Sequence, residues 1–247
     1  RQPWFKCACC PPNIARLLLS LGNYLYGVTE SDILVHLYAQ CSSTLSVGER
    51  QVTLHQQTNY PWDGTVRLEI EVDEPSEFGL HLRIPGWCRN ARLTLGGEDI
   101  PYEVHKGYAR ISRTWQSGES LVLHLDMPVE RIYPHPAIRE NVGCVALRSG
   151  PLIYCLETSD NPLPLHQICV PTSASFEKQF VPDLLGGITV LTGEVHALET
   201  SDWSGTLYRT TPPVSKPYTL TAIPYYGWDH REPGEMRVWL RTCEDDV

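Results

Sequence analysis

The sequence has little positive charge and no concentrated stretch of it. Its 247 residues include 20 Lys and Arg against 29 Asp and Glu, for a formal net charge of -9. Proteins that bind nucleic acids gather Lys and Arg to neutralise phosphates, and no Lys/Arg-rich run occurs here. The longest apolar runs are only as long as strands, too short to cross a bilayer. We therefore expect no nucleic-acid or membrane partner, and ligands that are neutral or small.

The nine cysteines are odd in number and lack the spacing of a short secreted disulfide framework. Three of them lie together, at Cys7, Cys9 and Cys10. We expect the isolated ones to be small core hydrophobes with free thiols: Cys41, Cys88, Cys144, Cys155, Cys169 and Cys243. Free thiols indicate a reducing compartment, so we predict a cytoplasmic protein. The chain opens at Arg1 without Met, and we expect its true N-terminus to lie upstream.

One helix is predicted near the start of the chain. Pro11 and Pro12 suit a first helical turn, where a missing N–H costs nothing. Apolar residues then recur at helical spacing, at Ile14, Leu17, Leu18, Leu21 and Tyr24. The first 26 residues are thus expected to end in a helix with one apolar stripe.

From about Tyr24 the apolar pattern changes to a period of two. Between residues 65 and 72, apolar side chains alternate with charged or polar ones, as a half-buried strand requires. Similar segments, separated by turn signals such as Lys106-Gly107, recur along the chain and are typical of a β-sandwich. A break in the pattern near Met127–Pro136 divides the chain into predicted domains at 27–130 and 131–247. Long loops are expected at 158–164 and 201–217.

The cysteine cluster is where the sequence concentrates chemistry. The helix dipole and the free N–H groups at a helix start favour a thiolate and so lower a thiol pKa. In an extended chain Cys9 and Cys10 point to opposite sides, so two adjacent metal ligands need a tight bend. Two or three cysteines do not complete a four-coordinate zinc shell. The residues alone leave two interpretations open: a catalytic metal site, or a closed structural site of inert thiols.

Four stretches of the sequence are distinctive: Cys-Ala-Cys-Cys-Pro-Pro-Asn-Ile-Ala-Arg at 7–16, Thr-Asn-Tyr-Pro-Trp-Asp-Gly-Thr at 58–65, Leu-Arg-Ile-Pro-Gly-Trp-Cys at 82–88, and 223–239 with its Pro-Gly-Glu-Met-Arg-Val-Trp ending. Together they resemble glycoside hydrolase family 127, which is typified by β-L-arabinofuranosidases. The resemblance implies an N-terminal (α/α)6 barrel followed by two β-sandwich domains. This mainly β chain would hold the last barrel helix and both sandwiches, and the rest of the barrel would be absent.

The resemblance also implies a retaining mechanism with a cysteine nucleophile held on Zn2+. Cys9 would be the nucleophile and a zinc ligand, and Cys10 would be a second zinc ligand. A Glu-x-Cys pair and a Glu acting as general acid/base would lie upstream of Arg1. The implied substrate is an oligosaccharide or glycan with β-linked L-arabinofuranose, and the second sandwich could form a homodimer.

Other candidate side chains carry weaker signals. We expect four histidines on polar strand faces to be solvent-exposed and assign them no role: His36, His55, His81 and His124. Tyr225, Tyr226 and Trp228 could form a platform for sugars, but core or interdomain packing is the favoured interpretation. The alternative for the whole chain is a non-catalytic sandwich module that binds carbohydrate or mediates dimerisation, with structural thiols.

Overall fold

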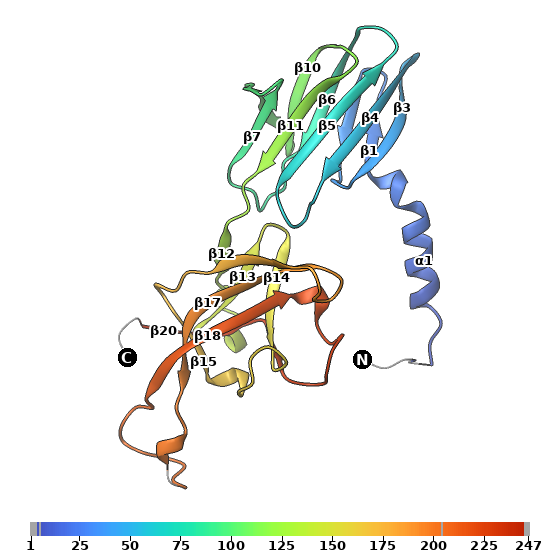
Figure 1. The fold of residues 1–247 in the computed structure, drawn as a ribbon. Helices are drawn as coiled ribbons and strands as arrows, with labels where there is room; N and C mark the ends of the chain where they lie inside the picture. The colour runs from blue at the N-terminus through green and yellow to red at the C-terminus, as the bar shows by residue number, and fades with distance from the viewer. Residues whose placement is uncertain (1–3, 5, 204, 245–247) are drawn as a thin grey trace. The chain divides into compact units, whose positions relative to one another are not determined.

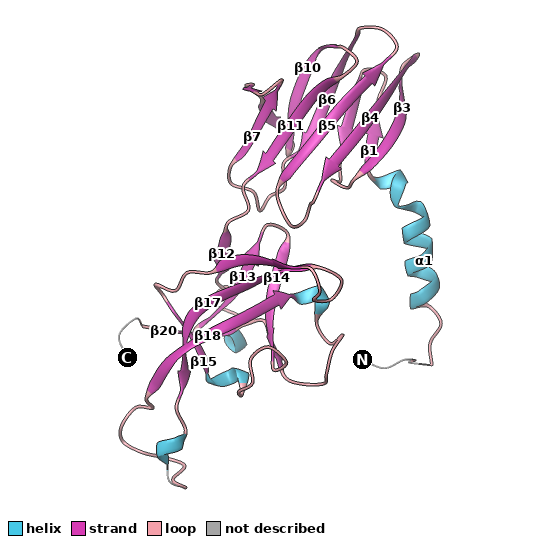
Figure 2. Ribbon diagram, in the orientation of Figure 1, coloured by secondary structure: helices cyan, strands magenta, loops and turns pink. Residues whose placement is uncertain are grey.

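The computed structural model describes residues 4, 6–203 and 205–244, and it forms two compact units. The first unit ends at Met127 and the second begins at Pro128. The predicted ranges 1–26 and 131–247 include residues 1–3, 5, 204 and 245–247, which lie outside the described residues. Figure 1 gives the element labels, and the secondary-structure view in Figure 2 shows that the chain is mainly β.

The predicted helix is present. Helix α1 spans Cys10–Ser20, with proline in its first turn, and continues into the 3-10 turn η1 at Leu21–Tyr24. It is the only α-helix in the described part of the chain. No residue of α1 is buried, and its apolar stripe is exposed at Ile14, Leu17 and Leu18. A helix with an apolar stripe needs a surface to cover it, and the described chain provides none. None of the helices in the described residues has the length and apolar character needed to cross a bilayer.

The first unit is a sandwich of two sheets. Its strands are β1 Tyr26–Val28, β2 Asp32–Val35, β3 Cys41–Val47, β4 Arg50–Thr58, β5 Thr65–Val72, β6 Ser76–Arg83, β7 Ala91–Leu95, β8 Glu98–Asp99, β9 Glu103–His105, β10 Tyr108–Trp115 and β11 Glu119–Leu125. One sheet has the order β1-β2-β6-β10-β9 and the other β3-β4-β5-β11-β7-β8. All pairings are antiparallel except β2 with β6, which is parallel.

The sandwich core follows from the period-two pattern. In β5 every second side chain is buried and the charged residues between them are exposed, as predicted. Leu68 and Leu121 face each other on neighbouring strands of one sheet, and both join a single apolar cluster with Leu80 of the other sheet. Trp115 is fully buried and donates its indole N–H to the carbonyl of Phe78 at 3.1 Å. The two inner faces therefore share one core.

The second unit is one connected sheet. Its strands are β12 Val129–Ile132, β13 Cys144–Ser149, β14 Leu152–Glu157, β15 Ile168–Pro171, β16 Glu177–Val181, β17 Ile188–Leu198, β18 Ser215–Pro224, β19 Met236–Arg237 and β20 Leu240–Cys243. The order is β12-β13-β20-β15-β17-β18-β14-β19, with β16 on β17. Because β13 also pairs with β14, the path β13-β20-β15-β17-β18-β14 closes on itself. The unit is a closed sheet around one apolar cluster, rather than the two separate sheets of a simple sandwich.

Strand boundaries differ from the predictions mainly in this second unit. The segment 236–243 contains two short strands, β19 and β20, which pair with different partners although only two residues separate them. The predicted loop at 158–164 contains no strand, and the predicted loop at 201–217 ends where β18 begins at Ser215. Short strands such as β15 and β16 lack a clear alternating pattern, and the sequence did not identify them.

The expectation of six isolated free thiols is wrong for two of them. Cys169 and Cys243 form a disulfide, although 74 positions separate them in sequence. Strands β15 and β20 pair in parallel and place the two Cα atoms 5.8 Å apart, within the range that disulfides require. Of the other four, only Cys155 is buried, and burial raises its thiol pKa to about 12. The compartment stays a prediction and now rests on fewer free thiols.

Candidate active site

Three thiols lie at the start of α1. Cys9 is the N-cap residue and already has helical backbone angles, φ -73° and ψ -37°, and its carbonyl accepts the N–H of Asn13 at 3.3 Å. Cys10 is the first residue of the helix. On the other side, Lys6 has a φ of 58°, so the chain turns sharply just before Cys7. The tight bend that two adjacent ligands need is therefore the start of the helix itself.

The sulfur atoms of the cluster are close together. The Sγ atoms of Cys9 and Cys10 are 3.6 Å apart, and those of Cys7 and Cys9 are 3.2 Å apart. Two thiolates on one tetrahedral zinc, each with a Zn–S bond of about 2.3 Å, have sulfurs about 3.8 Å apart. The Cys9–Cys10 pair is near this separation, whereas the Cys7–Cys9 pair is too close for it. The chemistry and the spacing both fit zinc at Cys9 and Cys10.

The thiol pKa values are shifted in opposite directions within the cluster. The pKa of Cys9 is raised, first because of its hydrogen bond with the Cys7 thiol and second because of that with Cys10. The pKa of Cys7 is lowered, first by a backbone hydrogen bond from Cys9 and then by its side chain. The lowering expected at a helix start therefore falls on Cys7. Cys9 needs a further positive charge to be a thiolate at neutral pH.

The rest of a metal shell is not supplied by the described residues. No group of three or more His, Cys, Asp or Glu side chains arranged to hold a metal ion occurs among them. The first turn of α1 also has no acidic residue. All three thiols are exposed. Within the described residues, Cys9 and Cys10 therefore provide two metal ligands and not a complete shell.

The four histidines expected to be exposed are in fact half-buried, so that expectation is wrong. His36 Nδ1 lies 2.7 Å from the Tyr108 hydroxyl. His81 Nε2 lies 3.2 Å from an Asp32 carboxylate oxygen, and burial lowers the pKa of His81. His81 on β6 thus links its strand to Asp32 on the neighbouring β2, and among the described residues none of the four histidines lies in a group that could hold a metal ion.

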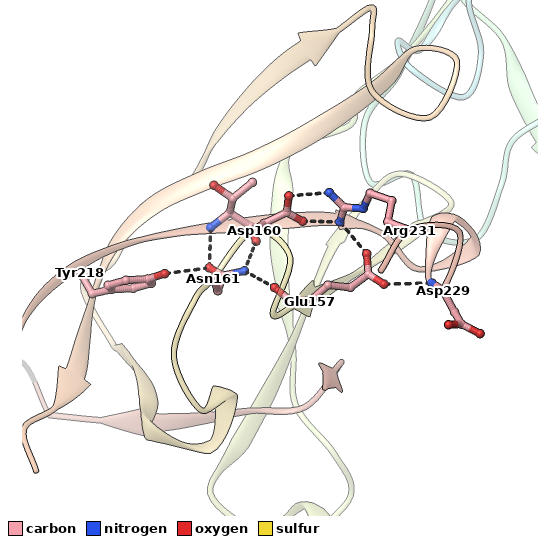
Figure 3. A network of polar contacts seen from close by, with 7 residues as sticks. Glu157, Asp160, Asn161, Tyr218, Asp229 and Arg231 are labelled. Atoms are coloured by element: carbon pink, nitrogen blue, oxygen red, sulfur yellow. Dashed lines mark hydrogen bonds and ion pairs between the residues drawn. The ribbon is translucent and has the colours of Figure 1, made fainter. Parts of the chain in front are cut away.

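A buried polar network occupies one end of β14 in the second unit (Figure 3). The Glu157 side chain is 6% exposed and accepts from Arg231 Nη2 at 2.6 Å. Arg231 also donates to both carboxylate oxygens of Asp160, at 2.7 and 2.5 Å. The other Glu157 oxygen accepts the backbone N–H of Asp229 at 2.9 Å. Asp229 has a φ of 61°, so this bond fixes a turn that L-residues rarely adopt.

The amide of Asn161 completes the network. Asn161 is fully buried and donates Nδ2–H to the carbonyls of Glu157 and Thr221, at 3.0 and 2.8 Å. Its Oδ1 accepts the N–H of Thr221 at 3.1 Å. Nearly every polar atom is satisfied internally, so the network serves to position the two loops that it joins. Glu157 and Arg231 are 74 residues apart, and no local pattern in the sequence signals that they meet.

The aromatic residues near 225 are not core residues. Tyr225 and Tyr226 are 45% and 54% exposed within this chain, so the core half of the expectation is wrong for both, and interdomain packing stays a prediction. Tyr225 stacks on Trp228, with ring centroids 6.1 Å apart and an angle of 15° between the planes. Trp228 directly precedes the turn at Asp229 that Glu157 fixes. The buried network therefore holds the exposed Tyr225 in place through the half-buried Trp228.

Comparison with protein families matches both units. Residues 32–127 match the family described as "Beta-L-arabinofuranosidase, GH127 middle domain". Residues 129–241 match the family described as "Glycoside hydrolase family 127 C-terminal domain". The two matches meet near Met127, where the two compact units also divide.

Characterised relatives resemble almost the whole chain. A non-reducing end β-L-arabinofuranosidase from Bifidobacterium longum subsp. longum is 35% identical, and the match covers 98% of this chain and 38% of that protein. The crystal structure of a GH127 β-L-arabinofuranosidase from Geobacillus stearothermophilus T6 is 47% identical, with a TM-score of 0.95, covering 98% of this chain and 39% of its own. A GH127 β-arabinofuranosidase structure is 34% identical, with a TM-score of 0.90 and coverages of 98% and 40%. The chain thus spans about two fifths of the length of these relatives.

Proposed function

Because the chain belongs to glycoside hydrolase family 127, we propose that it supplies the nucleophile of a retaining glycosidase that releases β-linked L-arabinofuranose from glycans or oligosaccharides. The observation that carries this proposal is the pair of sulfurs at Cys9 and Cys10, 3.6 Å apart at the start of α1. The named activities of the relatives supply the sugar. The match covers only part of each relative, so the activity of the whole protein is inferred.

Cys9 is the group proposed to act on the substrate. As a thiolate it attacks the anomeric carbon, forming a carbon–sulfur bond while the glycosidic oxygen leaves with a proton from a general acid. Water then displaces the sulfur, and two inversions give net retention. The raised pKa of Cys9 keeps the unassisted thiol protonated at neutral pH. Bound zinc would supply the positive charge that ionises this sulfur, held by Cys9 and Cys10.

The missing groups belong to a segment that covers α1. Within the described residues no third and fourth zinc ligands accompany the two cysteines. The exposed stripe of Ile14, Leu17 and Leu18 is the kind of helix face that packs inside a larger helical domain. An N-terminal (α/α)6 barrel would cover this stripe and bring the acid/base and the remaining ligands. The 247-residue chain alone is therefore expected to be inactive.

Zinc content and hydrolysis, measured on the full-length protein, test this proposal. We expect about one zinc per chain in the wild type, and loss of zinc in Cys10→Ala. Cys9→Ala should abolish hydrolysis of an aryl β-L-arabinofuranoside while leaving the protein folded, which thermal unfolding would verify. Cys7→Ala is the matched control and should keep its zinc, since its sulfur is too close to that of Cys9 to share the metal.

Two results would count against the proposal. Full hydrolysis by Cys9→Ala would show that Cys9 is not the nucleophile. Hydrolysis by the 247-residue chain alone would show that no upstream group is required. In the first case the alternative gains support, namely a sandwich module with structural thiols that binds carbohydrate or forms a dimer.

Homodimer formation through the second unit stays a prediction, to be checked by light scattering.

A further inference from the structure

An open groove of about 660 Å3 lies in the second unit, and the exposed Tyr225 lines part of it. Apolar and aromatic side chains line part of it: Tyr225, Met236 and Trp239. Polar side chains line the rest: Glu140, Asn141 and Arg237. Trp239 is half-buried and Tyr225 is 45% exposed, so ring surface is open to a ligand. Apolar faces with a few convergent polar groups are the usual composition of a small-molecule site.

The three polar side chains are free to bind. Among the described residues, the side chains of Glu140, Asn141 and Arg237 form no hydrogen bond or ion pair with one another or with other groups. Each presents two hydrogen-bonding atoms in one plane: a carboxylate, an amide and a guanidinium. One negative and one positive charge cancel, so the groove selects a neutral ligand rich in donors and acceptors. Adjacent hydroxyls of a sugar ring match such planar pairs, and the apolar C–H face of the ring matches an aromatic surface.

The groove is built on fixed elements. Met236 and Arg237 form β19, which pairs with Leu156 and Glu157 of β14. The carboxylate of Glu157 holds the turn at Asp229 (Figure 3). Trp228 directly precedes this turn and stacks against Tyr225. A site whose parts are held before the ligand arrives loses less entropy on binding. The buried network therefore also helps to fix the residues that line the groove.

We propose that this groove is a carbohydrate-binding site that takes an arabinose-containing oligosaccharide without hydrolysing it. The neutral-sugar chemistry follows from the groove, and the choice of arabinose rests on the proposed function. Tyr225 and Trp239 contact the sugar rings, and the planar groups of Glu140, Asn141 and Arg237 bind its hydroxyls. The site would keep the protein on a glycan while chemistry proceeds elsewhere on the same polymer.

Affinity electrophoresis of the 247-residue chain in native gels that contain soluble arabinan tests the proposal. We expect arabinan to retard the wild type and dextran not to do so. Tyr225→Ala and Glu140→Ala should each weaken retardation by roughly fivefold to tenfold, the loss that one aromatic or polar contact gives. Both side chains are on the surface, so the variants should fold, which thermal unfolding would verify. Tyr208→Ala is the matched control, because Tyr208 is an 88% exposed tyrosine outside the groove.

The outcomes separate this proposal from the catalytic one. Retardation that persists in Cys9→Ala and disappears in Tyr225→Ala supports a binding site that works without the nucleophile. Absence of retardation, or equal retardation of Tyr225→Ala and wild type, would overturn the site. Equal retardation by dextran and arabinan would overturn the assignment to arabinose-containing glycans.

Discussion

Replacing Arg231 by alanine is the sharpest test of the buried network in the second unit. The substitution leaves the Glu157 carboxylate, whose side chain is 6% exposed, next to Asp160 with no cation between them. Breaking one partner of a buried ion pair costs about 3–5 kcal/mol, because the remaining charge stays buried and unpaired. Arg231 itself is 20% exposed, so water reaches part of the site and we expect the lower end, about 3 kcal/mol. At about 4 °C per kcal/mol, the unfolding temperature should fall by roughly 12 °C.

The assay is urea unfolding of the 247-residue chain followed by tryptophan fluorescence and calorimetry. Arg92→Ala is the control, because Arg92 and Asp99 form an ion pair at 3.2 Å in which both side chains are more than half exposed. That pair should contribute at most about 1 kcal/mol. A double variant that combines Arg231→Ala with Glu157→Gln should regain part of the lost free energy of unfolding, because it removes the buried charge that Arg231 no longer neutralises. If Arg231→Ala costs no more than Arg92→Ala, the network is not held by a desolvated charge and the reasoning is wrong.

Two further predictions concern the first unit. Trp115→Phe should lower its free energy of unfolding by about 2–4 kcal/mol, because it leaves a cavity and an unpaired carbonyl at Phe78; an unchanged urea midpoint would contradict this. The pKa of Asp32 is lowered in the folded state, first by its hydrogen bond from Ser31. Its contribution to stability is therefore present above the ordinary carboxyl pKa of about 4 and is lost as the pH falls through the lower folded value. Asp32→Asn should destabilise the chain at pH 6 and much less at pH 2, and an equal effect at both would refute the pKa argument.

Local patterns predicted the first unit well and the second unit poorly, for a physical reason. Alternation in 65–72 gave the bounds of β5, because one face of that strand meets the core and the other meets water. The strands of the closed sheet in the second unit are more evenly buried, and in β15 all four residues are buried, so alternation disappears. The parallel pairing of β15 with β20 joins segments 74 residues apart, and the disulfide between them left no signal in either segment.

The candidate site shows the same division between local and distant information. The close approach of Cys9 and Cys10 follows from the Pro-Pro sequence and the helix start, both of which are local. The opposite pKa shifts of Cys7 and Cys9 depend on which thiol donates to which, and no residue pattern specifies that. The exposure of Tyr225 depends on a turn fixed by Glu157 from another part of the chain. Composition favoured the core for such a residue, and only the three-dimensional structure places it at the surface.

The position of β20 has a consequence for how the protein is made. This strand lies between β13 and β15 and contributes the buried Leu240, yet it leaves the ribosome after every other strand described in the second unit. Until then, the two neighbouring strands expose unpaired edges, which are templates for pairing with other chains. The first unit, by contrast, has all its strands once β11 has emerged. The second unit therefore closes only after β20 has emerged, and a chain interrupted between β18 and β20 would be left with an open sheet whose edges favour aggregation.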